Sequence, residues 1–147
     1  MPKIELSRII KAPREKVFEV VADPESMLEW WPGAETVEIL SREGNTIIVK
    51  GGGTMEGRKF VMTEKWTLYP PEKIDLELLE GPFYFKTIQT FEEVPEGTKL
   101  TWSSDISFKG VVGKILSIFG GSKLKDFSAQ TLDELAKYVE AQQAKTQ

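Results

Sequence analysis

The chain has 147 residues, of which 40% are hydrophobic and 29% charged, and its formal net charge is −4 at pH 7. These proportions are typical of a soluble globular protein, and the length suits one domain over residues 1–147. The absence of histidine and cysteine excludes Ser-His-Asp and Cys-His catalysis, disulfides, Cys/His zinc sites and the usual haem and iron–sulfur ligands. We therefore predict no cofactor and no metal, and any catalysis would use Asp, Glu, Lys, Tyr, Ser or Thr.

Charge and hydropathy exclude further classes of protein. A pI near 5.1 gives no basic face for nucleic acid. No apolar run approaches the roughly 18 residues of a membrane span, and the first residues lead into a strand pattern rather than a signal peptide, so the cytoplasm is the expected compartment. Lysine and glutamate far outnumber arginine and aspartate, a bias that is typical of heat-adapted proteins.

The N-terminal quarter of the chain predicts one strand and two short helices. Residues 3–11 alternate between apolar and polar side chains, which indicates a half-buried strand. Pro13 suits the first position of a helix, because its fixed φ angle is already helical. Asp23 is the expected N-cap of a second short helix that ends at residues 30–33.

From residue 36 to residue 109 the hydrophobic period changes to two. Turns rich in glycine, proline and acidic residues separate six strand-like runs, which predict six consecutive antiparallel strands. The runs near 58–69, 83–94 and 98–109 are about twice the usual strand length, so the sheet should be strongly bent. Glycines 51–53 supply a place to bend.

The C-terminal part of the chain predicts helix. A short helical pattern covers residues 111–119, and a long amphipathic helix runs from about Ser122 to Gln143, with Asp133 and Glu140 opposite its apolar side. An antiparallel sheet followed by one long amphipathic helix buries its apolar face under that helix. The predicted fold is α+β, in the order β-α-α-β6-α, with a strongly bent sheet wrapped around the C-terminal helix and an internal cavity between them.

Several segments also resemble a known family. They are Lys3–Leu6, Ala12–Phe18, Ala22–Pro24 with Trp30, Gly81–Phe83, Gly97–Leu100 and the C-terminal helix. Over nearly the full chain they resemble the START-like helix-grip (SRPBCC) superfamily, and within it the polyketide cyclase/dehydrase and coenzyme-Q-binding branch. The resemblance implies a ligand between sheet and long helix, in a cavity lined mostly by nonpolar side chains. It implies no single activity, because members include lipid carriers, hormone receptors, quinone-binding proteins and cyclases.

The period-two pattern also predicts which side chains face the cavity. Four polar residues interrupt the apolar inner faces: Arg8, Glu64, Gln89 and Ser104. Burying the Glu64 carboxylate between apolar neighbours costs free energy unless it is paired or protonated. We interpret Glu64, paired with Arg8 across the cavity, as a polar anchor for a quinone, phenol or carbonyl oxygen. Two other interpretations stay open: a bulge that turns Glu64 to solvent, or a purely structural ion pair between Glu64 and Arg8.

The predicted ligand-binding set combines these polar groups with aromatic and aliphatic neighbours. It comprises Arg8, Trp30, Phe60, Met62, Glu64, Trp66, Leu76, Phe85, Gln89, Trp102, Ser104, Phe127 and Thr131. Two adjacent indoles cannot both face one core, so of Trp30 and Trp31 we expect one to pack inward and the other to form the rim of the cavity. The aromatic members of the set would serve equally well as ordinary core residues.

Residues 109–125 carry four lysines and no acidic residue, on an otherwise acidic chain. The segment combines basic and apolar side chains, among them Lys114, Ile115, Ile118, Phe119 and Lys123. The simpler interpretation assigns the apolar ones to the core. The functional interpretation makes the segment a gate that transiently contacts an anionic membrane surface while a lipophilic ligand enters or leaves.

These features favour a binding or carrier protein for a small lipophilic ligand, such as an isoprenoid quinone, a lipid or a polyketide-like molecule. We expect it to act as a monomer or weak dimer. One alternative is an enzyme of the cyclase/dehydrase or hydrolase kind with Glu64 as general acid/base, and another is a protein-interaction module. Binding is favoured over catalysis because isolated polar groups on separate strands are typical of specificity contacts rather than of a proton-transfer set.

Overall fold

Seven antiparallel strands form one curved sheet in the computed structural model, which describes residues 3–55, 57–81, 84–107 and 121–145. The strands are β1 (Lys3–Ile10), β2 (Ala34–Glu43), β3 (Thr46–Met55), β4 (Arg58–Tyr69), β5 (Lys73–Glu80), β6 (Tyr84–Val94) and β7 (Gly97–Ser107). Their order in the sheet is β1-β7-β6-β5-β4-β3-β2. The six strands after the short helices therefore pair consecutively, as predicted, and β1 pairs with the last of them.

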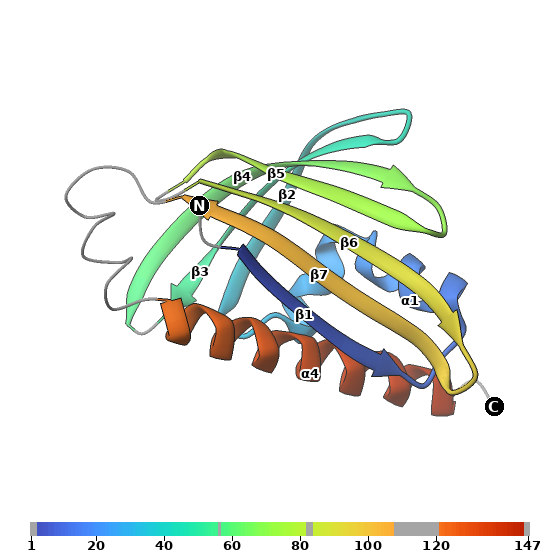
Figure 1. Ribbon diagram of the computed structural model, residues 1–147. Coiled ribbons are helices and arrows are strands. Elements are labelled where there is room, and N and C mark those ends of the chain that lie inside the picture. The colour runs from blue at the N-terminus through green and yellow to red at the C-terminus, as the bar shows by residue number, and fades with distance from the viewer. Residues whose placement is uncertain (1–2, 56, 82–83, 108–120, 146–147) are drawn as a thin grey trace.

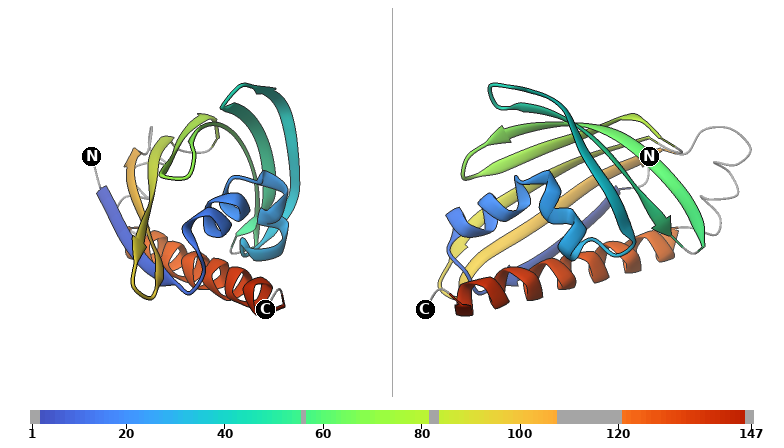
Figure 2. Two further views of the ribbon diagram at one scale, coloured as in Figure 1. Left: turned by 90° about the vertical axis from the view of Figure 1, so that its right-hand side faces the viewer. Right: turned by 180° about the vertical axis from the view of Figure 1, so that it is seen from behind.

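The helices in the described part of the chain are α1 (Arg14–Val21), the 3-10 helix η1 (Pro24–Ser26), α2 (Met27–Trp30) and α4 (Gly121–Lys145). The N-cap prediction at Asp23 is confirmed, because its Oδ1 accepts a hydrogen bond of 3.2 Å from the backbone N–H of Glu25. In Figure 1, α4 runs along the concave side of the sheet. Figure 2 shows α1 and α2 on that same side, so that sheet and helices enclose a common interior.

The interior holds the side chains that the alternation predicts. The main cluster joins α1, α4 and the strands β1, β5, β6 and β7, and its least exposed members are Ile10, Val17, Val21, Ile74, Leu100, Leu135, Ala136 and Val139. A smaller cluster of Ile47, Val49 and Trp66 lies between β3 and β4. Both clusters bury apolar surface, which is the main favourable contribution to folding.

Glycines allow β3 to approach the segment that enters β2. Gly33 has a φ of +85°, and its carbonyl oxygen accepts a hydrogen bond of 3.0 Å from the backbone N–H of Thr54. A Cβ atom at Gly53 would lie 2.2 Å from that same oxygen, which no side chain tolerates. The close contact therefore requires glycine at both positions.

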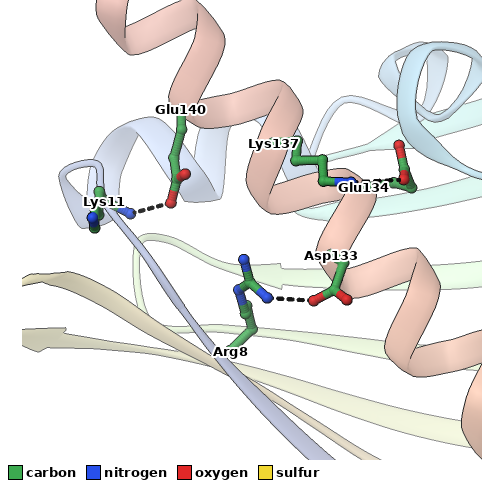
Figure 3. Close-up of polar contacts among 6 residues, drawn as sticks. All are labelled: Arg8, Lys11, Asp133, Glu134, Lys137 and Glu140. Carbon is green, nitrogen blue, oxygen red and sulfur yellow. Dashed lines mark hydrogen bonds and ion pairs between the residues drawn. The ribbon is translucent and has the colours of Figure 1, made fainter.

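The polar side of α4 differs from the prediction. Asp133 accepts a hydrogen bond from the Arg8 guanidinium, and Glu140 Oε2 accepts one of 2.9 Å from the backbone N–H of Lys11 (Figure 3). These residues were expected to lie opposite the sheet-facing side. They contact β1 and the residue that follows it, because β1 lies beside the helix. The sheet therefore covers part of the polar side of α4 as well as its apolar side.

Candidate functional site

A cavity of about 160 Å³ lies between the concave face of the sheet, α2 and the described part of α4. This is many times the space that one water molecule needs. Most of the predicted ligand-binding residues line it, namely Trp30, Phe60, Met62, Glu64, Trp66, Leu76, Phe85, Gln89, Trp102, Ser104 and Phe127. Their role in binding a ligand stays a prediction, but the structure brings their side chains together around one space.

Both adjacent indoles, Trp30 at the end of α2 and Trp31 directly after it, line the cavity, and Trp31 is partly exposed, which fits the expected rim position. Trp30 is buried, and its Nε1–H donates a 3.0 Å hydrogen bond to Ser26 Oγ. Trp31 stacks on Trp102 with ring centroids 6.3 Å apart and meets Phe127 edge-on at 6.1 Å. The chain leaves the helix at Trp31, whose backbone is extended. The two indoles can therefore reach the same cavity, although they are adjacent in the sequence.

Sequence reasoning missed one wall of the cavity. Besides Trp31 and Thr87, the lining includes Val21, Met27, Ala34, Thr36, Val37, Val49, Gly51, Gly52, Met55, Ile106 and Ser128. Many of these residues belong to β2 and β3, whose sequences contain no aromatic side chain. Gly51 in particular contributes open space, because a Cβ atom there would meet only the Thr36 carbonyl oxygen, at 3.5 Å.

Glu64 faces the cavity from the middle of β4, as predicted. The register shift near it skips Leu79 of β5 and leaves the alternation of β4 intact, so the solvent-facing interpretation is wrong. Its Oε1 accepts a hydrogen bond of 3.0 Å from Trp66 Nε1. Loss of hydration on burial raises the pKa of Glu64 above its ordinary value of 4.5, and the bond from Trp66 opposes this shift to a smaller extent.

Two further polar pairs border the cavity on β6 and β7. Trp102 Nε1 donates a hydrogen bond of 2.6 Å to Gln89 Oε1, and the hydroxyls of Thr87 and Ser104 lie 2.8 Å apart. Gln89 is directly opposite Trp102 in the register, and Thr87 is directly opposite Ser104. The hydrogen bond from Trp102 fixes the orientation of the Gln89 side-chain amide. The amide nitrogen of Gln89 is then a hydrogen-bond donor on the cavity wall.

Arg8 and Thr131 are corrections to the predicted set. Arg8 pairs with Asp133 of α4 and not with Glu64 (Figure 3), so the predicted pairing of these two residues is wrong, both across the cavity and as a structural ion pair. Thr131 is fully buried, and its Oγ1 donates a hydrogen bond of 2.8 Å to the Phe127 carbonyl oxygen. Neither residue is among those that line the cavity.

The predicted gate falls largely outside the described residues. Lys114, Ile115, Ile118 and Phe119 lie in 108–120, and Lys123 lies in the first turn of α4, where the structure describes no side chain. Within the described ranges, no group of three or more acidic residues is arranged to hold a metal ion. None of the helices described there is long and apolar enough to cross a membrane.

A curved seven-stranded sheet folded around a long C-terminal helix defines the helix-grip, START-like class, and a cavity between the two is where that class is expected to hold ligands. The chain belongs to the family described as polyketide cyclase/dehydrase and lipid transport, whose model matches residues 1–140. A Streptomyces cyaneus protein named "Putative polyketide cyclase" is 29% identical over 109 residues, covering 68% of this chain and 69% of that protein.

Solved structures show the same fold. The protein TTHA0849 of Thermus thermophilus has a TM-score of 0.85 at 21% identity, covering 95% of this chain and 98% of that one. The ZhuI aromatase/cyclase of Streptomyces sp. R1128 has a TM-score of 0.84 at 19% identity, with coverage of 95% and 93%. A START superfamily protein of Mycobacterium smegmatis has a TM-score of 0.74 at 22% identity, covering 99% of each chain. The α+β helix-grip prediction is therefore confirmed.

Proposed function

We propose that this protein binds a small lipophilic ligand in the cavity between sheet and helix and acts as its carrier. An isoprenoid quinone, a lipid or a polyketide-like molecule would fit this description. The observation that carries the proposal is a cavity bordered by aromatic and aliphatic side chains with only a few hydrogen-bonding groups among its described lining residues. Such lining is typical of small-molecule sites, and membership of a family that includes lipid transport supports it.

Different lining residues would provide the affinity for the ligand and its orientation. Apolar ligand surface that leaves water contributes about 25 cal/mol per Å², and the stacked rings of Trp31 and Trp102 on the cavity wall would supply part of the contact. Glu64, Gln89 and the Thr87–Ser104 pair would orient the polar end of the ligand through hydrogen bonds. Glutamine at position 64 would preserve an acceptor for Trp66, so a carrier should keep most of its affinity in Glu64→Gln.

Native mass spectrometry of the protein as purified tests the proposal. We expect a population heavier than the chain by the mass of one noncovalent ligand, and extraction with organic solvent should release a lipophilic compound of that mass. Protein that purifies without a lipophile, and then fails to take up any from a panel of quinones, lipids and polyphenols, would contradict the proposal.

A second candidate function is catalysis by Glu64 as general acid. Burial raises the pKa of this carboxyl, which suits a group that must hold a proton near neutral pH. Glu64→Gln separates the two functions. An enzyme would lose about 10²- to 10⁴-fold in turnover of the extracted compound while keeping its affinity, whereas a carrier would show no turnover in either form.

A further inference from the structure

The described neighbours of Glu64 on the sheet carry no charge. Along β4 its same-face neighbours are Met62 and Trp66, and across the strands it is opposite Val49 of β3 and Leu78 of β5. Val49, Trp66 and Leu78 are all less than 5% exposed. None of these neighbours can therefore supply a positive charge to the carboxylate, to which Trp66 donates only a hydrogen bond.

The opposite wall also lacks a cation within the described ranges. There α2 contributes Met27 and Trp30, Trp31 follows directly after that helix, and α4 contributes Phe127 and Ser128. No lysine or arginine occurs among the described residues that line the cavity, and Glu64 is the one ionisable side chain among them. The arginine expected to neutralise it is bound to Asp133 instead (Figure 3).

An anionic group that entered this cavity would lose its hydration, gain no positive partner from the described lining, and face Glu64. An uncharged carbonyl or hydroxyl would instead meet ready partners, namely the Gln89 amide, the Glu64 carboxyl and the Thr87–Ser104 hydroxyls. We propose that the cavity selects its ligand by charge, accepting lipophiles whose buried polar end is uncharged and excluding carboxylates, sulfonates and phosphates. This inference rests on the proposed binding function and narrows its ligand class.

Two dyes with one aromatic skeleton provide the test. N-phenyl-1-naphthylamine is uncharged, and 8-anilino-1-naphthalenesulfonate carries a sulfonate on the same rings. Fluorescence titration of the full chain at pH 7.5 should give at least a tenfold lower Kd for the uncharged dye, equivalent to about 1.4 kcal/mol. The uncharged dye is also the more apolar of the two. The decisive quantity is therefore how the ratio of the two Kd values, sulfonate dye over uncharged dye, changes among variants.

Glu64→Gln should lower the ratio of the two Kd values, and Glu64→Lys should lower it by a further tenfold or more by placing a cation in the cavity. Val61→Lys is the matched control, since Val61 lies on the same strand but is 57% exposed on the outer face, and the ratio there should equal that of the wild type. If Glu64→Lys does not fold, the ratio of the two Kd values in the wild type and in Glu64→Gln still tests charge selection.

The outcomes separate the two proposals. Equal affinity for both dyes, or a ratio that Val61→Lys changes as much as Glu64→Lys, would overturn charge selection and leave the binding function standing. Failure of the wild type to bind the uncharged dye at all would overturn both.

Discussion

The indole Nε1–H of Trp66 donates a 3.0 Å hydrogen bond to Oε1 of Glu64, two residues earlier on the same face of β4. Trp66 is only 2% exposed, so this bond also satisfies a donor that has left water. It fixes the orientation of one carboxyl oxygen and leaves the other for the cavity. The pair therefore links a core residue to the polar group that we assign to the ligand.

Glu64→Gln should change how stability depends on pH. The pKa of Glu64 is higher in the folded chain than its ordinary 4.5, so the folded state binds this proton more tightly than the unfolded state. The stability this provides is fully present below pH 4.5 and is lost as the pH rises through the folded pKa. Urea unfolding from pH 4 to 8 should show Glu64→Gln gaining stability relative to wild type as pH rises, then reaching a plateau. A difference that is constant over this range would refute the buried-carboxyl account.

Trp31→Ala should weaken ligand binding more than it weakens the fold. Trp31 is partly exposed and contacts the rings of Trp102 and Phe127, whereas Trp66 is fully buried. We expect Trp66→Ala to cost about 3–5 kcal/mol of unfolding free energy and Trp31→Ala clearly less. Titration with N-phenyl-1-naphthylamine should show at least a fivefold higher Kd for Trp31→Ala, about 1 kcal/mol. Trp31→Phe, which retains a ring, should recover part of the lost affinity. Full affinity in Trp31→Ala would show that Trp31 does not contact the ligand.

Two alanine substitutions on β3 should have opposite effects. At Gly53 the new Cβ would lie 2.2 Å from the Gly33 carbonyl oxygen, and at Gly51 it would lie 3.5 Å from its nearest neighbour. We expect Gly53→Ala to lose about 1–3 kcal/mol, as overpacked sites do. Gly51→Ala should be neutral or gain up to about 1 kcal/mol through reduced entropy of the unfolded chain. Chemical denaturation of both variants checks this, and comparable losses at the two sites would contradict the geometry.

The ion pair between Arg8 and Asp133 should contribute little to stability and nothing to ligand affinity. The two side chains are 40% and 50% exposed, and pairs of this kind are worth about 0.2–1 kcal/mol. A double-mutant cycle with Arg8→Met and Asp133→Asn should give a coupling energy in that range that shrinks in about 1 M NaCl. A loss of dye affinity in Arg8→Met would contradict the structure, in which Arg8 does not line the cavity.

The sequence predicted the inner face of β4 well, because period-two alternation fixes which side of a sheet a residue faces. It placed Phe60, Met62, Glu64 and Trp66 together without knowledge of the fold. It failed at Arg8, whose partner is 125 residues away. No local pattern identifies that partner, since it depends on how β1 lies beside α4.

The missed wall has a different cause. Gly51 and Gly52 line the cavity because they have no side chain, and sequence reasoning searches for groups that are present. One indole of the Trp30–Trp31 pair was expected at the rim, without an indication of which; the chain leaves the helix at Trp31, and that indole is the partly exposed one. In both places the site depends on backbone geometry rather than on the periodicity of side chains.

Blocking the cavity from within shows whether the ligand binds there. Gly51→Leu should project its side chain into the cavity without a backbone clash, and Val61→Leu adds bulk on the outer face of the sheet. Titrated with N-phenyl-1-naphthylamine, Val61→Leu should bind as the wild type does, and Gly51→Leu should bind at least tenfold more weakly, about 1.4 kcal/mol, while unfolding at a similar temperature. Undiminished binding by a folded Gly51→Leu would place the ligand elsewhere and contradict the account.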